Sequence, residues 1–307
     1  MLFSANGGVL STPPRIYYAN PLLLQGIDAW REVFDHAADT GFDHVLTAPL
    51  FDRDGERSVF ASRDFDRLDP ELSLGSDVGD GVARLVEAGR KSGVALMMDL
   101  MLDGRGRHPQ AGFRPVDPRR SPLDPAEPMA AMGAERQSQL LAEWTERLQR
   151  LSDAGLAGYR VLGIDRATPA FFKSLMAAVR EKTEAQFLAW TPGTDFAVRG
   201  GINEAGFNGC FSSMAWWDFD ERWFIDEHRV QQPLGWQVAF PEPPFARRIA
   251  HGTESREILE RRAVRALRLA ASLGGGLMVP MGFEYGAATP LDPTHGCLLY
   301  TSDAADE

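Results

Sequence analysis

Short apolar runs alternate with longer stretches of helical periodicity along most of this 307-residue chain. Eight runs rich in apolar and β-branched residues predict strands at 16–19, 44–48, 95–100, 158–162, 186–190, 209–212, 237–240 and 276–280. Seven stretches with apolar residues at i, i+3, i+4 and i+7 predict helices at 26–40, 77–92, 135–154, 168–183, 195–205, 218–230 and 255–273. Strict alternation of strand and helix implies parallel strands with right-handed crossovers, so the sequence predicts an α/β fold, a closed (β/α)8 barrel.

The predicted barrel lacks its last helix. An eighth helix should follow Gly286, and no helical pattern is found there. Residues 297–307 resemble the translation of an adapter used in sequencing libraries, so we expect them not to be native. The expected domain is a barrel over residues 1–296, truncated before the eighth helix. Within it, residues 101–134 are rich in Pro, Gly and Arg and predict a loop excursion at the end of the third strand, where barrel active sites are built.

Charge and apolar patterning exclude several classes of function. Asp and Glu outnumber Lys and Arg by 43 to 32, a net charge of −11, which disfavours binding to nucleic acid or an anionic membrane surface. The longest apolar runs, such as 94–102, are far shorter than the roughly 20 residues of a membrane span. Residues 1–15 lack the pattern of a secretion signal, so we expect a soluble, cytoplasmic protein. The two cysteines and six histidines show no metal-ligand spacing, and we expect neither a metal nor a cofactor.

Sequence motifs stand at the ends of five predicted strands. They are MDLMLDG at 98–104, GYRVL at 158–162, FLAWTPG at 187–193, FPEPPF at 240–245 and VPMGFEYG at 279–286. In this order they resemble the D-x-V-x-N-H, G-F-R-x-D, general-acid, F-x-E-N-H-D and G-x-E-x-G regions of the α-amylase superfamily, glycoside hydrolase family 13. The run GFDHVL at 41–46, together with FLA and GFEYG, is similar to maltosyltransferases that extend α-1,4-glucan from maltose 1-phosphate. The resemblance implies an α-amylase-type barrel from a protein of α-glucan metabolism.

The same resemblance implies that the catalytic positions are degenerate. A retaining glycosidase needs a carboxylate nucleophile and a second carboxyl group about 5–5.5 Å away that acts as acid and base. By position in the motifs, Leu162 replaces the nucleophile, Trp190 the general acid and Phe245 the aspartate that stabilises the transition state. None of these side chains can attack, donate a proton to a leaving oxygen or carry negative charge. Weaker candidates for relocated catalytic carboxylates are Asp165 and Glu242.

The remaining candidate residues each have a functional and a structural interpretation. By resemblance, Asp99 and Arg160 shape a sugar subsite, or they form a structural ion pair beneath the barrel mouth. Glu242 projects into the mouth, or it pairs with Arg247 or Arg248. Asp165 would face away from the site on an extended strand, so a loop would have to redirect it.

Aromatic residues supply the other candidate site. Trp190 ends a predicted strand, and its ring could stack on a sugar. For Trp217 and Trp223, packing between barrel and helix is the preferred interpretation.

These residues leave three hypotheses about function. The first is a catalytically degenerate domain of a maltosyltransferase-like protein, which binds α-1,4-glucan or maltooligosaccharide through Asp99, Arg160, Trp190 and Glu242, or docks an active barrel on the same native polypeptide. The second is an active glycoside hydrolase or maltosyltransferase with relocated carboxylates, for instance Asp99, Asp165 or Glu242. The third is a purely structural barrel. Turnover and ligand binding distinguish the three.

Overall fold

Eight parallel strands form a closed barrel in the computed structural model, which describes residues 12–53, 58–102, 119, 134–253 and 255–297. Around the barrel the strands follow the order β1-β10-β9-β8-β7-β6-β5-β2. Their bounds are Arg15–Ala19 (β1), His44–Thr47 (β2), Ala95–Leu100 (β5), Gly158–Val161 (β6), Gln186–Ala189 (β7), Gly209–Phe211 (β8), Trp236–Ala239 (β9) and Gly276–Pro280 (β10). All eight predicted strands are therefore confirmed.

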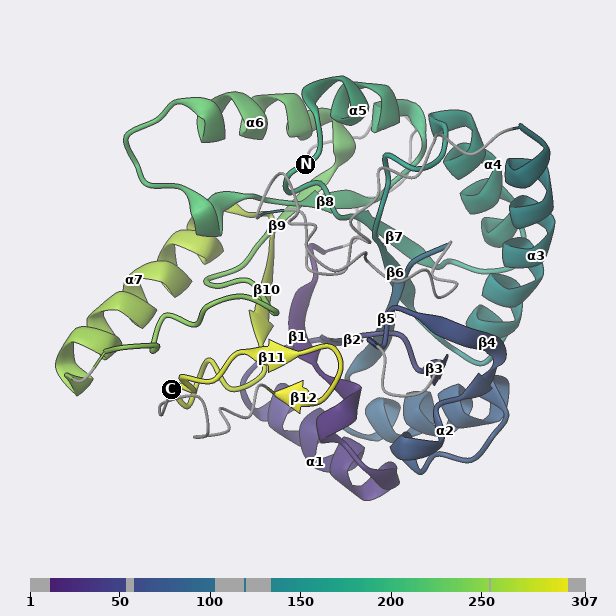
Figure 1. The fold of residues 1–307 in the computed structure, drawn as a ribbon, viewed down its shortest axis with the longest axis horizontal. Coiled ribbons are helices and arrows are strands. Elements are labelled where there is room, and N and C mark those ends of the chain that lie inside the picture. Colours follow the sequence, from purple (N-terminus) through teal and green to yellow (C-terminus); the bar gives the residue numbers. More distant parts are fainter. Residues whose placement is uncertain (1–11, 54–57, 103–118, 120–133, 254, 298–307) are drawn as a thin grey trace, which may run out of the picture.

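Seven α-helices surround these strands in chain order (Figure 1). They are α1 (Gly26–Asp39), α2 (Val78–Lys91), α3 (Ala134–Asp153), α4 (Pro169–Arg180), α5 (Phe196–Gly201), α6 (Trp223–Gln231) and α7 (Arg256–Leu273). Side-chain caps define several starts: the Asp77 carboxylate accepts from the amide of Asp80, and the Ser255 hydroxyl accepts from that of Ile258. No helix in the described part of the chain is long and apolar enough to cross a membrane.

Alternation along the strands divides their apolar side chains between two clusters. Ile16 and Tyr18 of β1 point into the barrel, whereas Tyr17 and Ala19 pack outward against the helices. The other strands repeat this division, because each face of a parallel sheet in a barrel is buried. On the inner face of β5 and β6, the adjacent residues Asp99 and Arg160 are charged rather than apolar.

Two short antiparallel hairpins were not predicted. The first joins β3 (Phe51–Arg53) and β4 (Ser62–Leu68) after β2, and its Phe65 packs edge-on against Trp144 of α3 with 5.0 Å between ring centroids. The second joins β11 (Leu291–Asp292) and β12 (Gly296–Cys297). Cys297, the first residue of the expected adapter segment, thus pairs with Leu291, while residues 298–307 lie outside the described part.

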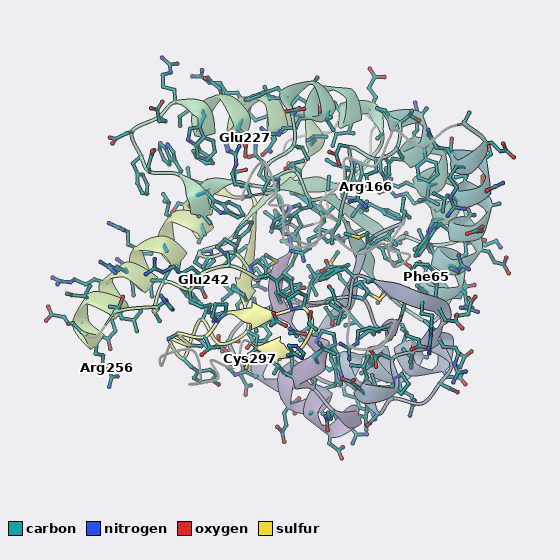
Figure 2. All side chains as sticks on the ribbon, viewed as in Figure 1. Phe65, Arg166, Glu227, Glu242, Arg256 and Cys297 are labelled. Atoms are coloured by element: carbon teal, nitrogen blue, oxygen red, sulfur yellow. The ribbon has the colours of Figure 1, made fainter. Side chains whose placement is uncertain are left out.

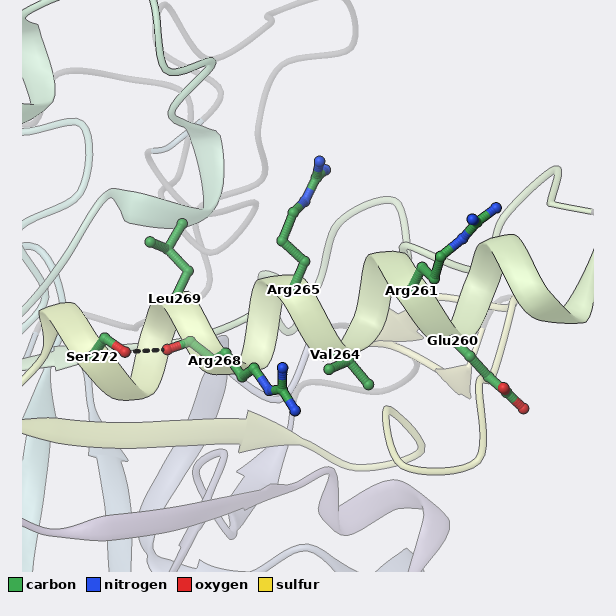
Figure 3. Close-up of a pocket in the computed structure, with 7 residues that line it drawn as sticks. All are labelled: Glu260, Arg261, Val264, Arg265, Arg268, Leu269 and Ser272. Atoms are coloured by element: carbon green, nitrogen blue, oxygen red, sulfur yellow. Dashed lines mark hydrogen bonds between the residues drawn. The ribbon is translucent and has the colours of Figure 1, made fainter.

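The predicted absence of an eighth helix is confirmed for the described residues, since none follows β10. Figure 1 shows no helix between α7 and α1, and α7 buries only Ala270. Figure 3 shows side chains of α7 on an open surface, among them Val264, Arg265 and Arg268. Val264 there is 45% exposed. A helix with this apolar surface uncovered is typical of a barrel that lacks a neighbouring element.

Candidate functional site

A buried ion pair lies at the centre of the barrel. Asp99 and Arg160 are register partners on β5 and β6, so both side chains point inward from neighbouring strands. The Arg160 Nε donates to Asp99 Oδ1 and Nη2 donates to Oδ2, each at 2.6 Å, in the bidentate geometry that suits a guanidinium group. The Tyr18 hydroxyl also donates to Oδ2, at 3.1 Å. The ion pair is therefore observed, and a role of these two residues in shaping a sugar subsite stays a prediction.

Burial sets the electrostatics of this pair. Removal from water raises the pKa of Asp99 above its usual value, against the lowering effect of the Arg160 charge. Burial alone would lower the pKa of Arg160, but the Asp99 charge more than offsets it, and the guanidinium stays charged. Both side chains are at most 1% exposed, so neither offers surface to a ligand.

Trp190 lies over this pair at the end of β7. Its ring centroid is 4.8 Å from the Arg160 Cζ, and its ring stacks on Phe240 at 5.5 Å with 14° between the planes. The side chain is 7% exposed, and its indole N–H has no hydrogen-bond partner within the described residues. The N–H itself is buried, so it is an unsatisfied donor inside the apolar cluster, which is costly.

Leu162 and Phe245 present apolar side chains at the two other positions where the resemblance places catalytic carboxylates. Leu162 follows β6 and is buried, with its amide donating to the Leu100 carbonyl at 2.9 Å. Phe245 packs edge-on against Tyr18 at 5.7 Å and Phe60 at 5.8 Å. Both belong to the apolar cluster that fills the barrel interior. The apolar cluster therefore extends from the barrel interior to both residues.

A hairpin closes over the same end of the barrel. Asn20 directly follows β1, and its side-chain Nδ2 donates to the carbonyls of Asp292 and Gly296 at 2.8 and 2.9 Å. The Val59 amide donates to the Pro293 carbonyl at 2.8 Å, and Leu291 joins the interior cluster. The hairpin β11–β12 therefore packs onto the mouth rather than leaving it open.

Glu242 lies outside the apolar mouth, beside β10 (Figure 2). Its Oε1 is 2.9 Å from the Arg248 Nε, and its Oε2 accepts from the Ile249 amide at 2.8 Å. Burial raises the pKa of Glu242, opposed by the Arg248 charge. The alternative interpretation, a carboxylate paired with arginine, is the one observed.

Asp165 lies in a turn, because β6 ends at Val161 and Gly163 takes a left-handed φ of +62°. Its carboxylate is half-buried there rather than projecting from the strand. No group of three His, Cys, Asp or Glu side chains among the described residues could hold a metal ion.

A second buried ion pair was missed from the sequence. Arg199 of α5 and Glu227 of α6 lie 2.9 Å apart, both at most 2% exposed, and Glu227 Oε1 accepts from the Ser213 amide at 3.0 Å. Figure 2 shows Glu227 on the inner side of α6. The signal was the spacing of Phe224, Glu227 and Gln231, which share one helix face and are all buried.

Sequence comparison relates this chain to part of one longer protein. Over 298 aligned residues it is 31% identical to the α-1,4-glucan:maltose-1-phosphate maltosyltransferase of Burkholderia pseudomallei (strain K96243). The alignment covers 92% of this chain and 26% of that protein, so the chain spans about a quarter of the length of the curated relative. No protein-family model matches the chain.

Solved structures with the same fold include three enzymes. The α-amylase of Geobacillus thermoleovorans, in complex with acarbose, has a TM-score of 0.66 and 15% identity, covering 94% of this chain and 74% of that one. A maltogenic α-amylase of Thermotoga neapolitana scores 0.65 at 16% identity, covering 96% and 73%. The trehalose-6-phosphate hydrolase of Bacillus licheniformis scores 0.67 at 12% identity, covering 92% and 66%. The chain is an α-amylase-type barrel.

The α-amylase-type barrel that the sequence motifs predicted is confirmed. The structural likeness shows the fold, and the sequence likeness is to a maltosyltransferase. The arrangement at its mouth can stack and shield apolar surface but offers no pair of ionisable carboxylates among Leu162, Trp190 and Phe245.

Proposed function

We propose that this barrel is a non-catalytic α-glucan-binding domain of a maltosyltransferase-like protein. The observation that supports it is the continuous apolar cluster at the three positions where the resemblance places catalytic carboxylates, Leu162, Trp190 and Phe245. Hydrolysis or transfer through an oxocarbenium-like transition state needs a carboxylate at two of them. The maltosyltransferase name of the relative supplies the substrate class, an α-1,4-glucan.

The candidates for relocated carboxylates argue against an active enzyme. Asp99 is bound by both arms of Arg160, and Glu242 is bound by Arg248 and a backbone amide. Both oxygens of each carboxylate already accept hydrogen bonds or ion-pair contacts from these groups, so neither carboxylate has an oxygen without a partner for a substrate. Asp165 lies in the turn after β6. These contacts support the proposal of a non-catalytic domain over that of an active enzyme with relocated carboxylates.

Trp190 is the residue of the mouth that we assign to glucan binding. Its side chain is 7% exposed, and its buried, unpartnered indole N–H would donate to a sugar hydroxyl once the hairpin β11–β12 moves off the mouth. In this proposal Asp99 and Arg160 do not touch the sugar, since both are buried, but hold Trp190 from below. In the same proposal Glu242 does not touch the sugar but holds the Arg248 guanidinium group in place through their ion pair.

Docking of an active barrel on a longer polypeptide is a second candidate role. The exposed face of α7 favours it, because Val264 and Ile258 are large apolar residues with 45% and 40% of their surface exposed. The relative is about four times as long as the segment aligned here, which leaves room for such a partner.

Calorimetric titration with maltoheptaose tests the proposed function. We expect saturable binding that weakens at least tenfold in Trp190→Ala and remains in Trp236→Ala. Trp236 is a matched control, because it belongs to the same interior cluster but begins β9, at the opposite end of the barrel. A ligand at 100 times its Kd should also add about 2.7 kcal/mol to the free energy of unfolding. Equal affinity in both variants would remove Trp190 from the site.

A further inference from the structure

Three buried residues from separate parts of the chain direct hydrogen-bond donors at the hairpin β11–β12. Asn20 follows β1, Arg53 ends β3, and Val59 lies between β3 and β4. The Asn20 Nδ2 reaches two hairpin carbonyls at 2.8 and 2.9 Å, the Arg53 Nη1 reaches one at 2.9 Å, and the Val59 amide reaches one at 2.8 Å. Because buried donors are costly without partners, this part of the mouth needs acceptors above it.

The hairpin meets these donors with main-chain oxygens rather than with side chains. Beside them, Leu291 is 6% exposed and belongs to the interior cluster that also contains Trp190. Several acceptor oxygens next to an apolar group are also what a sugar offers, since its hydroxyls accept hydrogen bonds while its C–H face is apolar. The accepting carbonyls are those of Asp292, Pro293, Thr294 and Gly296.

The hairpin itself is small (Figure 1). Each of its strands has two residues, and its turn is closed by the Asp292 carboxylate, which accepts from the amides of Thr294 and His295 at 2.8 and 2.7 Å. A two-stranded hairpin is marginally stable by itself, and such units open at a lower free energy than the whole domain. The hairpin can therefore leave the mouth while the barrel stays folded.

We propose that Asn20, Arg53 and the Val59 amide form a hydroxyl-binding subsite for an α-1,4-glucan, which the hairpin β11–β12 occupies until a sugar displaces it. The hairpin is then an autoinhibitory strap, because it supplies the acceptors that the sugar would bring and covers the mouth beside Trp190. The apparent affinity for glucan is reduced by the fraction of molecules in which the hairpin is closed. This inference rests on the proposed function for the class of ligand.

The surroundings of Arg53 favour an uncharged ligand. Its Nε donates to the Asp69 carboxylate, and its Nη2 lies 2.6 Å from Glu71 Oε2. These two carboxylates compensate the guanidinium charge, so a neutral hydroxyl suits the subsite better than a phosphate group. They also fix the direction of Nη1 before a ligand arrives, which lowers the entropy lost on binding.

Calorimetric titration with maltoheptaose tests the strap. Asp292→Ala should bind at least threefold more tightly than the unaltered protein, because the hairpin loses the two bonds that close its turn. Asp218→Ala is the matched control and should leave the affinity unchanged. Its carboxylate caps a similar turn between β8 and α6, accepting from the amides two and three residues on at 3.1 and 3.2 Å.

Asn20 variants test the subsite. Asn20→Asp keeps the side-chain oxygen that accepts from the Leu22 amide but loses both donors, so maltoheptaose should bind at least fivefold more weakly. Asn20→Ala removes the same donors without adding a charge and should also bind more weakly. Both variants loosen the hairpin as well, so an anchor that held only the hairpin would give the opposite result, tighter binding.

Amide hydrogen exchange at Val59 gives a second readout. This amide donates to the Pro293 carbonyl in the closed hairpin, so its exchange should be faster in Asp292→Ala. Saturating maltoheptaose should slow the exchange again in that variant, because a sugar oxygen takes the place of the carbonyl. An amide that stays fast in the saturated variant would show that the sugar binds elsewhere and would overturn the subsite.

The possible results separate this inference from the proposed function. Tighter binding in both Asn20 variants would overturn the subsite. Equal affinity of the unaltered protein and Asp292→Ala, with faster Val59 exchange in the variant, would overturn the strap and leave the glucan-binding function standing. Binding by Asp292→Ala alone would support both, since the closed hairpin would then block the unaltered protein. Absence of binding by either protein would overturn both.

Discussion

The indole ring of Trp190 covers the guanidinium group of Arg160, with 4.8 Å from ring centroid to Cζ. Tyr18 covers the same cation at the same distance, and Asp99 binds it from within the barrel. Where the resemblance places a general acid, this chain thus has an aromatic ring that seals a buried ion pair. The ring thus supports the packing of apolar side chains around a buried cation.

Removal of one partner from this pair should be strongly destabilising. Arg160→Ala leaves the Asp99 carboxylate buried without a counter-charge, and we expect a loss of about 3–5 kcal/mol in the free energy of unfolding. The double variant Asp99→Leu with Arg160→Met should recover most of that loss, since neither charge remains. Urea unfolding measures both. Glu87→Ala, which breaks an exposed pair with Arg90, is the control and should leave the midpoint unchanged. Equal midpoints for Arg160→Ala and the unaltered protein would disprove the structural role.

The pH dependence of stability should change in Glu242→Gln. Burial raises the pKa of Glu242, so its contribution to stability is fully present below its ordinary value of 4.5 and is lost as the pH rises through the raised value. We therefore expect the unfolding free energy of the unaltered protein, relative to Glu242→Gln, to fall as the pH is raised from about 4 to 7. Urea titrations at several pH values give this difference. Glu260→Gln, on the exposed face of α7, controls for the change in net charge. A difference that rises with pH would mean that the effect of Arg248 exceeds that of burial.

Cys210 should be inert to alkylation in the folded protein. Burial raises its pKa to about 12, and the thiolate is the reactive form. In Cys297→Ser protein at pH 8, we expect iodoacetamide to label Cys210 only as denaturant unfolds the barrel. Cys297 is partly exposed, so its labelling in native Cys210→Ser protein shows that the reagent is active. Fast labelling of native Cys210 would show that β8 opens locally.

Two glycines with similar backbone conformations should differ in their tolerance of a side chain. Gly235 and Gly41 have φ values of +97° and +87°. A Cβ at Gly235 would lie 2.3 Å from the Asn208 carbonyl oxygen, whereas a Cβ at Gly41 meets no atom within 4 Å. Gly41→Ala should cost about 1 kcal/mol through backbone strain alone, and Gly235→Ala clearly more. Thermal unfolding of both variants measures the difference, and equal losses would mean that the loop before β9 relaxes freely.

The barrel could be predicted because each of its strands is a short apolar run between clear breaks. The hairpin β3–β4 could not, since Ser62–Leu68 carries four charged residues and reads as surface loop. The candidate site could also be predicted only in part. The motifs indicated that Asp99, Arg160 and Trp190 lie near one another, but only the register of β5 and β6 decides that the two charges pair. The helix predicted at 218–230 begins only at Trp223, and Phe219 lies before it with a φ of +74°, which nothing local to it favours.

The most direct test of the account measures binding and turnover on the same preparation. Maltoheptaose and maltose 1-phosphate are incubated with the protein, and reducing sugar and phosphate release are followed while titration gives the affinity for maltoheptaose. We predict saturable binding of maltoheptaose with no product above the protein-free blank. Turnover that persists through purification and disappears in Asp165→Asn or Glu242→Gln would contradict the account, because it would show a working enzyme with relocated carboxylates.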